Sequence, residues 1–383
     1  MKFLHLSDLH IGLKLMNRDM GEDQAYVFRE IVEIAADRQP DAIVIAGDIY
    51  DKAVPSAEAA TLFDRFISAL TQALPSAVIM MISGNHDSAP RLNIYRQILR
   101  SRNVYMIGLP PQRPEDHIEK IILRDAYGPV NFYLLPFVKP SMIRDIAGTD
   151  ENGNSLSYDA SVHRLIEREK IDGNQRNVLV SHQFYLPSGA DPNDVERMDS
   201  EIRMAGNIDE VRADILERFD YAALGHIHKP MRVGSEFFRY PGTPMACSFS
   251  EAGQQKGIIE VELSEKGHVR TNVLPLQPLH GVRVIRGSLR DVLQQGCEDY
   301  VSVVLTDKED LDVIDMQDYI RQAFPNVLEI RRDAVREVNT GIEAAEEILM
   351  DPFALCRSYL GDLDEEEQEL LRSVINEAAE GNG

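Results

Sequence analysis

Five short stretches of this sequence place Asp, Asn or His directly after an apolar run rich in β-branched residues. The polar stretches are Asp8-Leu9-His10, Gly47-Asp48 through Asp51, Gly84-Asn85-His86-Asp87, Ser181-His182 and Gly225-His226-Ile227-His228. The runs that precede them are Phe3–Leu6, Ala42–Ala46, Val78–Ile82, Val178–Val180 and Tyr221–Leu224. Such runs are typical of buried strands, so the polar side chains should emerge at strand ends. We expect one sheet edge to hold them together.

The side chains in these stretches offer oxygen and imidazole nitrogen as ligands, without thiolate. This set suits harder or borderline divalent ions such as manganese, iron(II), zinc or magnesium. Seven such groups are too many for one ion, so the sequence predicts two ions that share a carboxylate. Two ions roughly 3.5 to 4 Å apart lower the pKa of a bridging water and clamp a phosphate, as phosphodiester hydrolysis requires. A nearby histidine could protonate the departing alkoxide.

The elements that must position these groups alternate along the sequence up to about Leu276. Apolar strand runs alternate with amphipathic helical stretches, which we place at Asp23–Gln39, Ser56–Leu74 and Arg91–Ser101. From Phe237 to Leu276 the pattern changes to strands joined by short turns, of which Lys266-Gly267 is the clearest. A mixed pair of sheets sandwiched by helices accommodates both patterns.

A second, smaller unit is predicted after the linker-like stretch Pro275–Gly281. Its order is strand, helix, strand, helix, strand, at Val282–Arg286, Ser288–Gln295, Tyr300–Thr306, Val313–Phe324 and Val327–Arg331. Ser288 and Asp291 give the first of these helices a capped start.

The sequence beyond Asp333 is acidic and predicts two amphipathic helices. One begins at Asp351-Pro352, and the other at Asp364 with Glu367. We favour an external partner for their apolar faces, and the alternative is that they pack on each other or on the rest of the chain.

Composition and charge limit the possible functions. With 383 residues, no run of eighteen apolar residues and no signal peptide, the chain is expected to be cytoplasmic and to hold two or three domains. The net charge of −23 argues against broad adhesion to nucleic acid. However, the last 51 residues hold 14 Asp/Glu and 3 Lys/Arg, which accounts for −11. Divalent ions would also reverse the field inside a carboxylate-lined cleft. The three cysteines, Cys247, Cys297 and Cys356, are expected to be reduced packing residues.

The five polar stretches, in this order and spacing, resemble the complete motif set of the metallophosphoesterase superfamily. Within it, the sequence is similar to the SbcD family of nuclease subunits of bacterial SbcCD DNA-repair complexes. The similarity rests on Leu6–Gly12, Gly84–Leu92 and Tyr221–His228, and on the later Arg239–Pro244, Ser248–Glu251 and Lys256-Gly257. It covers roughly the whole chain, with a looser match in the acidic tail.

The resemblance implies a fold and a domain plan. The fold is an α/β, four-layer αββα metallophosphoesterase sandwich with a small α/β capping domain and a helical C-terminal tail. Residues 1–276 would be the nuclease domain, 281–332 a DNA-binding capping domain, and 333–383 the helical region that binds an SbcC-like ATPase. A homodimer within a heterotetramer is the arrangement of the family.

The resemblance also implies roles for individual residues. One ion would be held by Asp8, His10, Asp48 and His228, and the other by Asp48, Asn85, His182 and His226, with Asp48 as the bridge. His86 would be the catalytic proton donor, and Mn²⁺ the metal, although ligand chemistry alone does not separate it from iron or zinc.

Several residues near the motifs keep two interpretations. Asp51 and Asp87 either orient metal ligands or cap loops. Arg91 either steadies a phosphate or begins a helix, and we favour the helix. The Gly-, Asp- and Asn-rich loop from Pro187 to Asn207, with Arg197 and Arg203, either borders the substrate cleft or is an ordinary insertion. His5 is expected to be buried and hydrogen-bonded, and surface or packing roles are expected for His117, His163, His268 and His280.

The sequence therefore predicts a two-metal DNA exonuclease and endonuclease that acts on DNA ends or hairpins. Two other functions stay open: a stand-alone phosphodiesterase or phosphatase acting on nucleotides or phosphoproteins, and a scaffold that has lost catalysis. The extra unit after Gly281 argues against the first, because a small substrate does not require it. The presence of every ligand position argues against the second.

Overall fold

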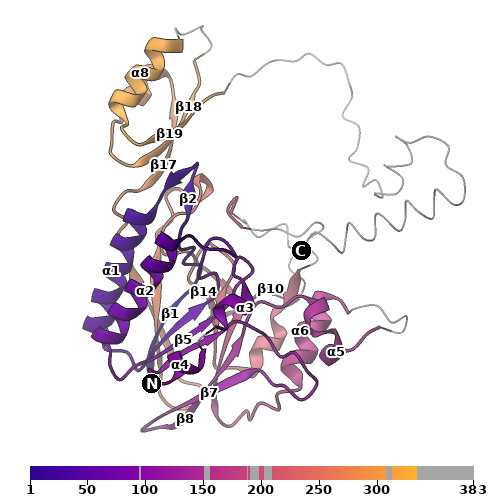
Figure 1. The fold of residues 1–383 in the computed structure, drawn as a ribbon. Coiled ribbons are helices and arrows are strands. Elements are labelled where there is room, and N and C mark those ends of the chain that lie inside the picture. Colours follow the sequence, from indigo (N-terminus) through magenta and orange to yellow (C-terminus); the bar gives the residue numbers. More distant parts are fainter. Residues whose placement is uncertain are drawn as a thin grey trace, which may run out of the picture. The chain divides into compact units, whose positions relative to one another are not determined.

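Two six-stranded sheets, stacked face to face, form the centre of the computed structural model of the chain (Figure 1). The structure describes residues 1–94, 96–150, 156–187, 189, 198–201, 209–307 and 313–333. The first sheet has the strand order β16-β15-β1-β4-β5-β6. Its strands are β1 (Lys2–Leu6), β4 (Ala42–Ala46), β5 (Val78–Ile82), β6 (Val104–Ile107), β15 (Gly257–Leu263) and β16 (Val269–Pro275).

The second sheet has the order β13-β14-β12-β9-β8-β7. Its strands are β7 (Glu119–Asp125), β8 (Gly128–Leu135), β9 (Arg176–His182), β12 (Tyr221–Gly225), β13 (Met231–Val233) and β14 (Ser235–Tyr240). In each sheet four neighbouring strands are parallel, β1, β4, β5 and β6 in the first and β8, β9, β12 and β14 in the second. The continuous apolar runs follow from burial of these parallel strands on both faces.

Helices cover the two outer faces. On the first sheet, α1 (Gly21–Arg38) and α2 (Ala57–Ala73) lie side by side and bury Phe28 and Phe66 against β1 and β4 (Figure 1). On the second sheet, α6 (Tyr158–Glu167) packs Val162 and Leu165 against β9 and β12. Between the sheets lies a third apolar layer that includes Phe3, Val44, Phe132, Val180 and Tyr221. The predicted four-layer αββα sandwich is confirmed.

The predicted helices fit the structure at two of three places. Expected Asp23–Gln39 and Ser56–Leu74 match α1 and α2, and the Ser56 hydroxyl caps α2 by accepting from Ala59 N. The continuous helix expected at Arg91–Ser101 is wrong. The chain instead forms α3 (Ala89–Leu92) and α4 (Arg96–Arg100), with a turn at Asn93 and Ile94 after the proline-started first piece.

The smaller unit has the predicted order of elements. It contains β17 (Val282–Gly287), α7 (Leu289–Leu293), β18 (Tyr300–Leu305), α8 (Val313–Ala323) and β19 (Val327–Arg332), with a parallel sheet β17-β18-β19. The Ser288 hydroxyl caps α7 by accepting from Asp291 N, as expected. Asp23 of α1 joins this unit to the sandwich, because its buried carboxylate accepts from the Tyr300 hydroxyl at 2.8 Å and lies 2.9 Å from His280 Nδ1.

Short elements complete the described chain. They are β2 (Lys14–Leu15), β3 (Arg18–Asp19), α5 (Arg144–Ala147), β10 (Phe184–Leu186), β11 (Glu210–Arg212) and 3-10 helices at Pro140–Ile143, Ala213–Arg218 and Phe249–Glu251. Among the helices of the described residues, none has the length and apolar character needed to cross a membrane. The two helices predicted beyond Asp333, with Cys356, lie outside the described residues.

Candidate metal centre

The five polar stretches do emerge at strand ends, but at the carboxyl ends of two facing sheets rather than along one sheet edge. Asp8, Asp48 and Asn85 follow β1, β4 and β5 of the first sheet, whereas His182 and His226 come from the ends of β9 and β12 of the second. The expectation of a single edge is therefore wrong. Runs of buried strands look alike in sequence, and which sheet each one joins is decided by long-range pairing.

Glycines allow these strand ends to approach one another. A methyl group on Gly225 would lie 1.9 Å from the Ala46 carbonyl oxygen, and one on Gly84 would lie 2.1 Å from Asp48 Oδ1. Gly47 has a φ of 94°, and a methyl group there would collide with the His182 ring. These three glycines are therefore required by the close approach of neighbouring groups.

The backbone is strained at the candidate ligands themselves. Asp8, His10, Asp48 and His226 all have positive φ, between 42° and 103°. Non-glycine residues rarely adopt this region, at a cost of about 1–3 kcal/mol each, and such outliers gather at functional sites. The conformation turns each side chain sharply after its strand.

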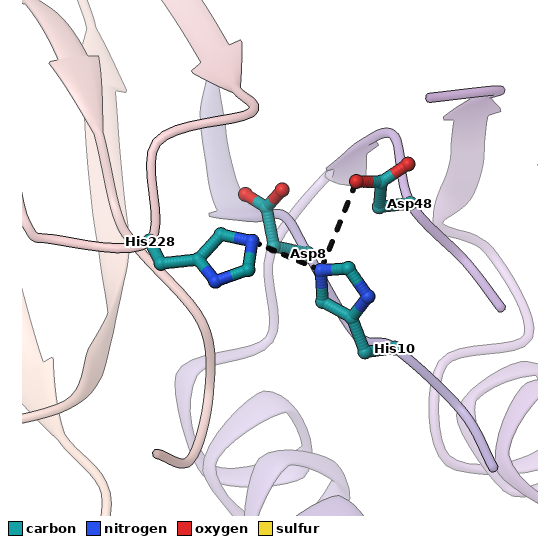
Figure 2. Close-up of side chains that lie close together, drawn as sticks. All are labelled: Asp8, His10, Asp48 and His228. Carbon is teal, nitrogen blue, oxygen red and sulfur yellow. Dashed lines mark hydrogen bonds and ion pairs between the residues drawn. The ribbon is translucent and has the colours of Figure 1, made fainter. Parts of the chain in front are cut away.

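The first cluster of side chains comprises Asp8, His10, Asp48 and His228. One ligand atom from each lies within 4.8 Å of every other, and all four residues are buried. Figure 2 shows the four side chains directed toward one another. His10 Nε2 lies 3.0 Å from His228 Nε2 and 3.7 Å from Asp48 Oδ2. The structure thus brings together the residues predicted for the first ion.

The second cluster shares Asp48 with the first. His182 Nε2 lies 3.3 Å from Asp48 Oδ2 and 3.0 Å from Asn85 Oδ1. His226 Nδ1 lies 2.9 Å from the same Asn85 oxygen. All the residues predicted for the second ion therefore converge, with the Asp48 carboxylate between the two clusters.

Charge in the centre is arranged around Asp48. Burial alone would raise the pKa of Asp48, but the His182 imidazole beside it holds the pKa well below its usual range. Burial would likewise lower the pKa of His182, and the Asp48 carboxylate instead raises it to about 9. Burial raises the pKa of Asp8 to about 6 and is also the largest cause that lowers the pKa of His10. The field around Asp48 therefore attracts positive charge.

The donor set fits divalent cations. His182 Nδ1–H donates to the Ala46 carbonyl at 2.7 Å, which directs Nε2 toward the oxygens of Asp48 and Asn85. The Nε2 atoms of His10 and His228 likewise face each other at 3.0 Å. Lone pairs that face one another at these distances repel unless a proton or cation lies between them, and mixed nitrogen and oxygen donors are ligands for manganese, iron or zinc.

His86 borders both the centre and solvent. Its Nδ1 lies 3.0 Å from the Asp51 carbonyl oxygen, its Nε2 lies 4.0 Å from Asp48 Oδ2, and its side chain is 14% exposed. The ring packs edge-on against His10. His86 is therefore held by the backbone near the clusters without being a member of the predicted ligand sets.

Asp51, Asp87 and Arg91, for which the sequence left two roles open, occupy different positions in the structure. Asp87 accepts from the backbone N–H groups of Ile49, Tyr50 and Gly84, which is the geometry of a loop cap, and burial raises its pKa to about 7. Asp51 Oδ1 lies 3.7 Å from His10 Nδ1 and so faces a predicted metal ligand. Arg91 is an exposed residue within α3.

Sequence reasoning assigned no role to a polar network behind His228. The network contains Ser200, Glu201, Thr243, Glu251 and Lys256. Ser200 and Glu201 belong to the loop that was expected to border the cleft, whose Arg197 and Arg203 lie outside the described residues. Burial of charge was the missing signal, because Glu251 and Lys256 read as ordinary polar residues until the fold buries them.

Histidines outside the motifs stay apart from the centre in the described chain. His5 is buried and contacts the Tyr221 hydroxyl and the Leu224 carbonyl, as expected, and burial lowers its pKa to about 3. His117 is exposed and lies near Glu169, whereas the mostly buried His163 lies near Asp159.

Comparison with known proteins agrees with this geometry. Residues 1–230 match the family described as calcineurin-like phosphoesterase, and residues 277–360 match the Type 5 capsule protein repressor C-terminal domain, SbcD_C. A relative named as the SbcD subunit of the SbcCD nuclease, from Staphylococcus epidermidis (strain ATCC 12228 / FDA PCI 1200), is 30% identical over 335 residues. These cover 86% of this chain and 84% of the relative.

Solved structures with a similar fold are more distant. A dimetal phosphatase from Danio rerio is 15% identical, with a TM-score of 0.41 over 72% of this chain and 95% of its own. The protein TT1561 of Thermus thermophilus is 14% identical, with a TM-score of 0.40 over 71% and 98%. The family matches and the sequence relative decide the assignment: the chain belongs to the SbcD family of calcineurin-like phosphoesterases.

Proposed function

We propose that this chain is a metal-dependent DNA nuclease that hydrolyses phosphodiesters as the SbcD-type subunit of an SbcCD-like complex. The observation that carries the proposal is the pair of buried clusters joined at Asp48. The relationship to the SbcD subunit of the staphylococcal SbcCD nuclease supplies the substrate and the partner. The enzyme is a phosphodiester hydrolase with exonuclease and endonuclease activity on DNA ends and hairpins.

The two clusters would each hold one divalent ion. Bound there, the pair would supply an activated water and a clamp for the phosphoryl oxygens. Asp48 orients both sets of ligands, and the imidazoles of His182 and His228 are fixed through their Nδ1 atoms. The remaining proton transfer falls to a residue of the chain.

His86 is placed for that transfer. In its imidazolium form, Nδ1–H donates to the Asp51 carbonyl at 3.0 Å, and Nε2–H faces the centre. Because the ring is partly exposed, a departing alkoxide can reach Nε2 and accept its proton. The proposal therefore assigns His86 as the general acid.

Manganese is the ion we propose, because the family resemblance implies it and the donors, nitrogen and hard oxygen without sulfur, accept it as they accept iron or zinc. Removal of metal by a chelator should abolish cleavage, and Mn²⁺ should restore it more fully than Mg²⁺ or Ca²⁺. Restoration by zinc or iron alone would replace manganese while leaving the two-metal site in place.

Partners and location are part of the same proposal. An SbcC-like ATPase would bind residues 333–383, DNA would contact the β17–β19 unit, and the complex would be a heterotetramer with two copies of this chain in the cytoplasm. Truncation after about Glu337 should spare cleavage of a small phosphodiester but release the ATPase. Continued co-purification with the ATPase would contradict the tail assignment.

One assay tests the function directly. The purified chain with Mn²⁺ should degrade linear and hairpin DNA, both with and without the ATPase. The same preparation is offered cyclic nucleotides as the competing substrate class. No cleavage of DNA with rapid turnover of cyclic nucleotides would show a small-substrate phosphodiesterase instead.

A further inference from the structure

The network behind His228 is built on one buried carboxylate. The Glu251 side chain is 0% exposed, and its Oε2 accepts from Lys256 Nζ at 2.6 Å and from the Thr243 hydroxyl at 2.9 Å. Its Oε1 accepts from the Ser200 hydroxyl at 2.8 Å. Three donors, one of them an ammonium group, therefore fix Glu251 as an acceptor on both of its oxygens.

Ser200 connects this acceptor to the metal ligand. Its hydroxyl has one proton, which it donates to Glu251, and its oxygen lies 2.7 Å from His228 Nδ1. A hydroxyl that donates to a carboxylate has only lone pairs left for a second partner. His228 Nδ1 must then carry a proton and donate to Ser200, so that in the neutral ring the unprotonated nitrogen is Nε2, which faces His10 Nε2 at 3.0 Å.

His228 depends on side chains more than its counterpart in the second cluster. The His182 ring is fixed by the backbone, because Nδ1–H donates to the Ala46 carbonyl. The ring of His228 is instead held by the Ser200 side chain. Two further side chains hold the backbone of His228: Glu201 accepts from its amide N–H at 3.0 Å, and Lys256 donates to its carbonyl at 3.1 Å. Direct contact between His228 Nδ1 and Glu251 Oε1 is 3.6 Å, too long for a hydrogen bond.

We propose that Ser200 and Glu251 are positioning residues for the first ion: Glu251 orients the Ser200 hydroxyl, and Ser200 fixes the tautomer and ring orientation of His228. This inference rests on the proposed function for the presence of two metals. Such outer partners of a metal-bound histidine typically change metal affinity by roughly 10- to 100-fold when removed. The effect belongs to the cluster of Asp8, His10, Asp48 and His228, and the cluster around Asn85 is unaffected.

Metal titration of the full chain tests the proposal without any nuclease assay. Chelator-stripped protein is titrated with Mn²⁺ by calorimetry, and Ser200→Ala should weaken one of the two binding events by roughly 10- to 100-fold. Ser200→Thr keeps the hydroxyl and should restore the wild-type Kd. Ser157→Ala is the matched control, because it also removes a serine hydroxyl, one that caps α6 by accepting from Ala160 N.

A second variant guards against misfolding. Glu251→Gln keeps an acceptor of the same shape, and circular dichroism at the titration temperature establishes that each variant is folded. In Glu251→Gln, we expect Mn²⁺ to bind more weakly in the same one of the two binding events as in Ser200→Ala. Two wild-type Kd values in Ser200→Ala, or equal weakening of both events, would overturn the positioning role. Neither result bears on DNA cleavage, so a failure here is separate from a failure of the proposed nuclease.

Discussion

The sandwich and the β17–β19 unit are both built from parallel strands and helices, but in the described residues the polar groups that directly follow their strands have different partners. In the smaller unit, Ser288 follows β17 and caps α7, and Asp307 follows β18 and accepts from Leu289 N at 2.7 Å. These polar groups bind local backbone. In the sandwich, a second sheet stands opposite the first, so Asp48 meets His182 across the stack. In this chain, the candidate site forms where a second set of strand ends faces the polar residues that follow the first.

The largest effect expected from this comparison is the loss of Asp48. Asp48→Asn removes the charge shared by both clusters, so cleavage of a small chromogenic phosphodiester should fall by more than the roughly 10²- to 10⁴-fold assigned to a general acid. Asp307→Asn makes the same chemical change after a strand of the smaller unit and should alter kcat little. Similar losses in the two variants would contradict the distinction between shared and locally bound carboxylates.

Substitution of His86 separates the effect on proton transfer from the effect on metal binding. His86→Ala should lower kcat by roughly 10²- to 10⁴-fold, because the proposed proton donor to the leaving group is lost. Calorimetry with Mn²⁺ should still give two binding events, since His86 lies outside both predicted ligand sets. Wild-type cleavage by this variant would remove the proposed acid, and loss of a binding event would make His86 a ligand.

Sequence alone predicted the layers and the converging residues because both are written in local patterns. Each motif follows its own apolar strand, so Asp8, Asp48 and Asn85 could be placed at strand ends without knowing the pairing of the strands. The division of the strands between two sheets is not a local property, and it was missed. The break at Asn93 was missed as well, because the helical pattern continues on both sides of it.

The network of Ser200 and Glu251 shows a second limit of prediction from sequence. Ser200 precedes His228 by 28 residues and Glu251 follows it by 23, and no local pattern in the sequence links either residue to the histidine. Their contacts exist only because the fold brings the segments together. The residues that converge in the centre were thus predictable from sequence, whereas Ser200 and Glu251, which we propose position His228, required the three-dimensional structure.

Charge burial makes the two regions differ in stability as well. Glu251→Ala leaves Lys256 buried without its partner, so the free energy of unfolding should fall by about 3–5 kcal/mol. In the smaller unit, Arg286→Ala removes an exposed ion pair with Asp333 and should cost no more than about 1 kcal/mol. Chemical denaturation measures both changes in the free energy of unfolding, provided that the variants share the same m-value. Equal costs would show that the Glu251–Lys256 pair is no better isolated from solvent than the surface pair.

The smallest effect should be that of Arg286→Ala on the salt dependence of DNA binding. Arg286 is exposed, and an ion pair of that kind exchanges readily for a phosphate, so its contribution is expected in binding rather than in chemistry. If it contacts one phosphate, Arg286→Ala should reduce the slope of log K against log salt by about 0.9 and leave cleavage of the small phosphodiester unchanged. A matched Arg113→Ala change, at an exposed pair with Asp116 in the sandwich, provides the baseline. An unchanged salt slope in both variants would place the DNA away from this edge of the β17–β19 unit and leave the catalytic centre as proposed.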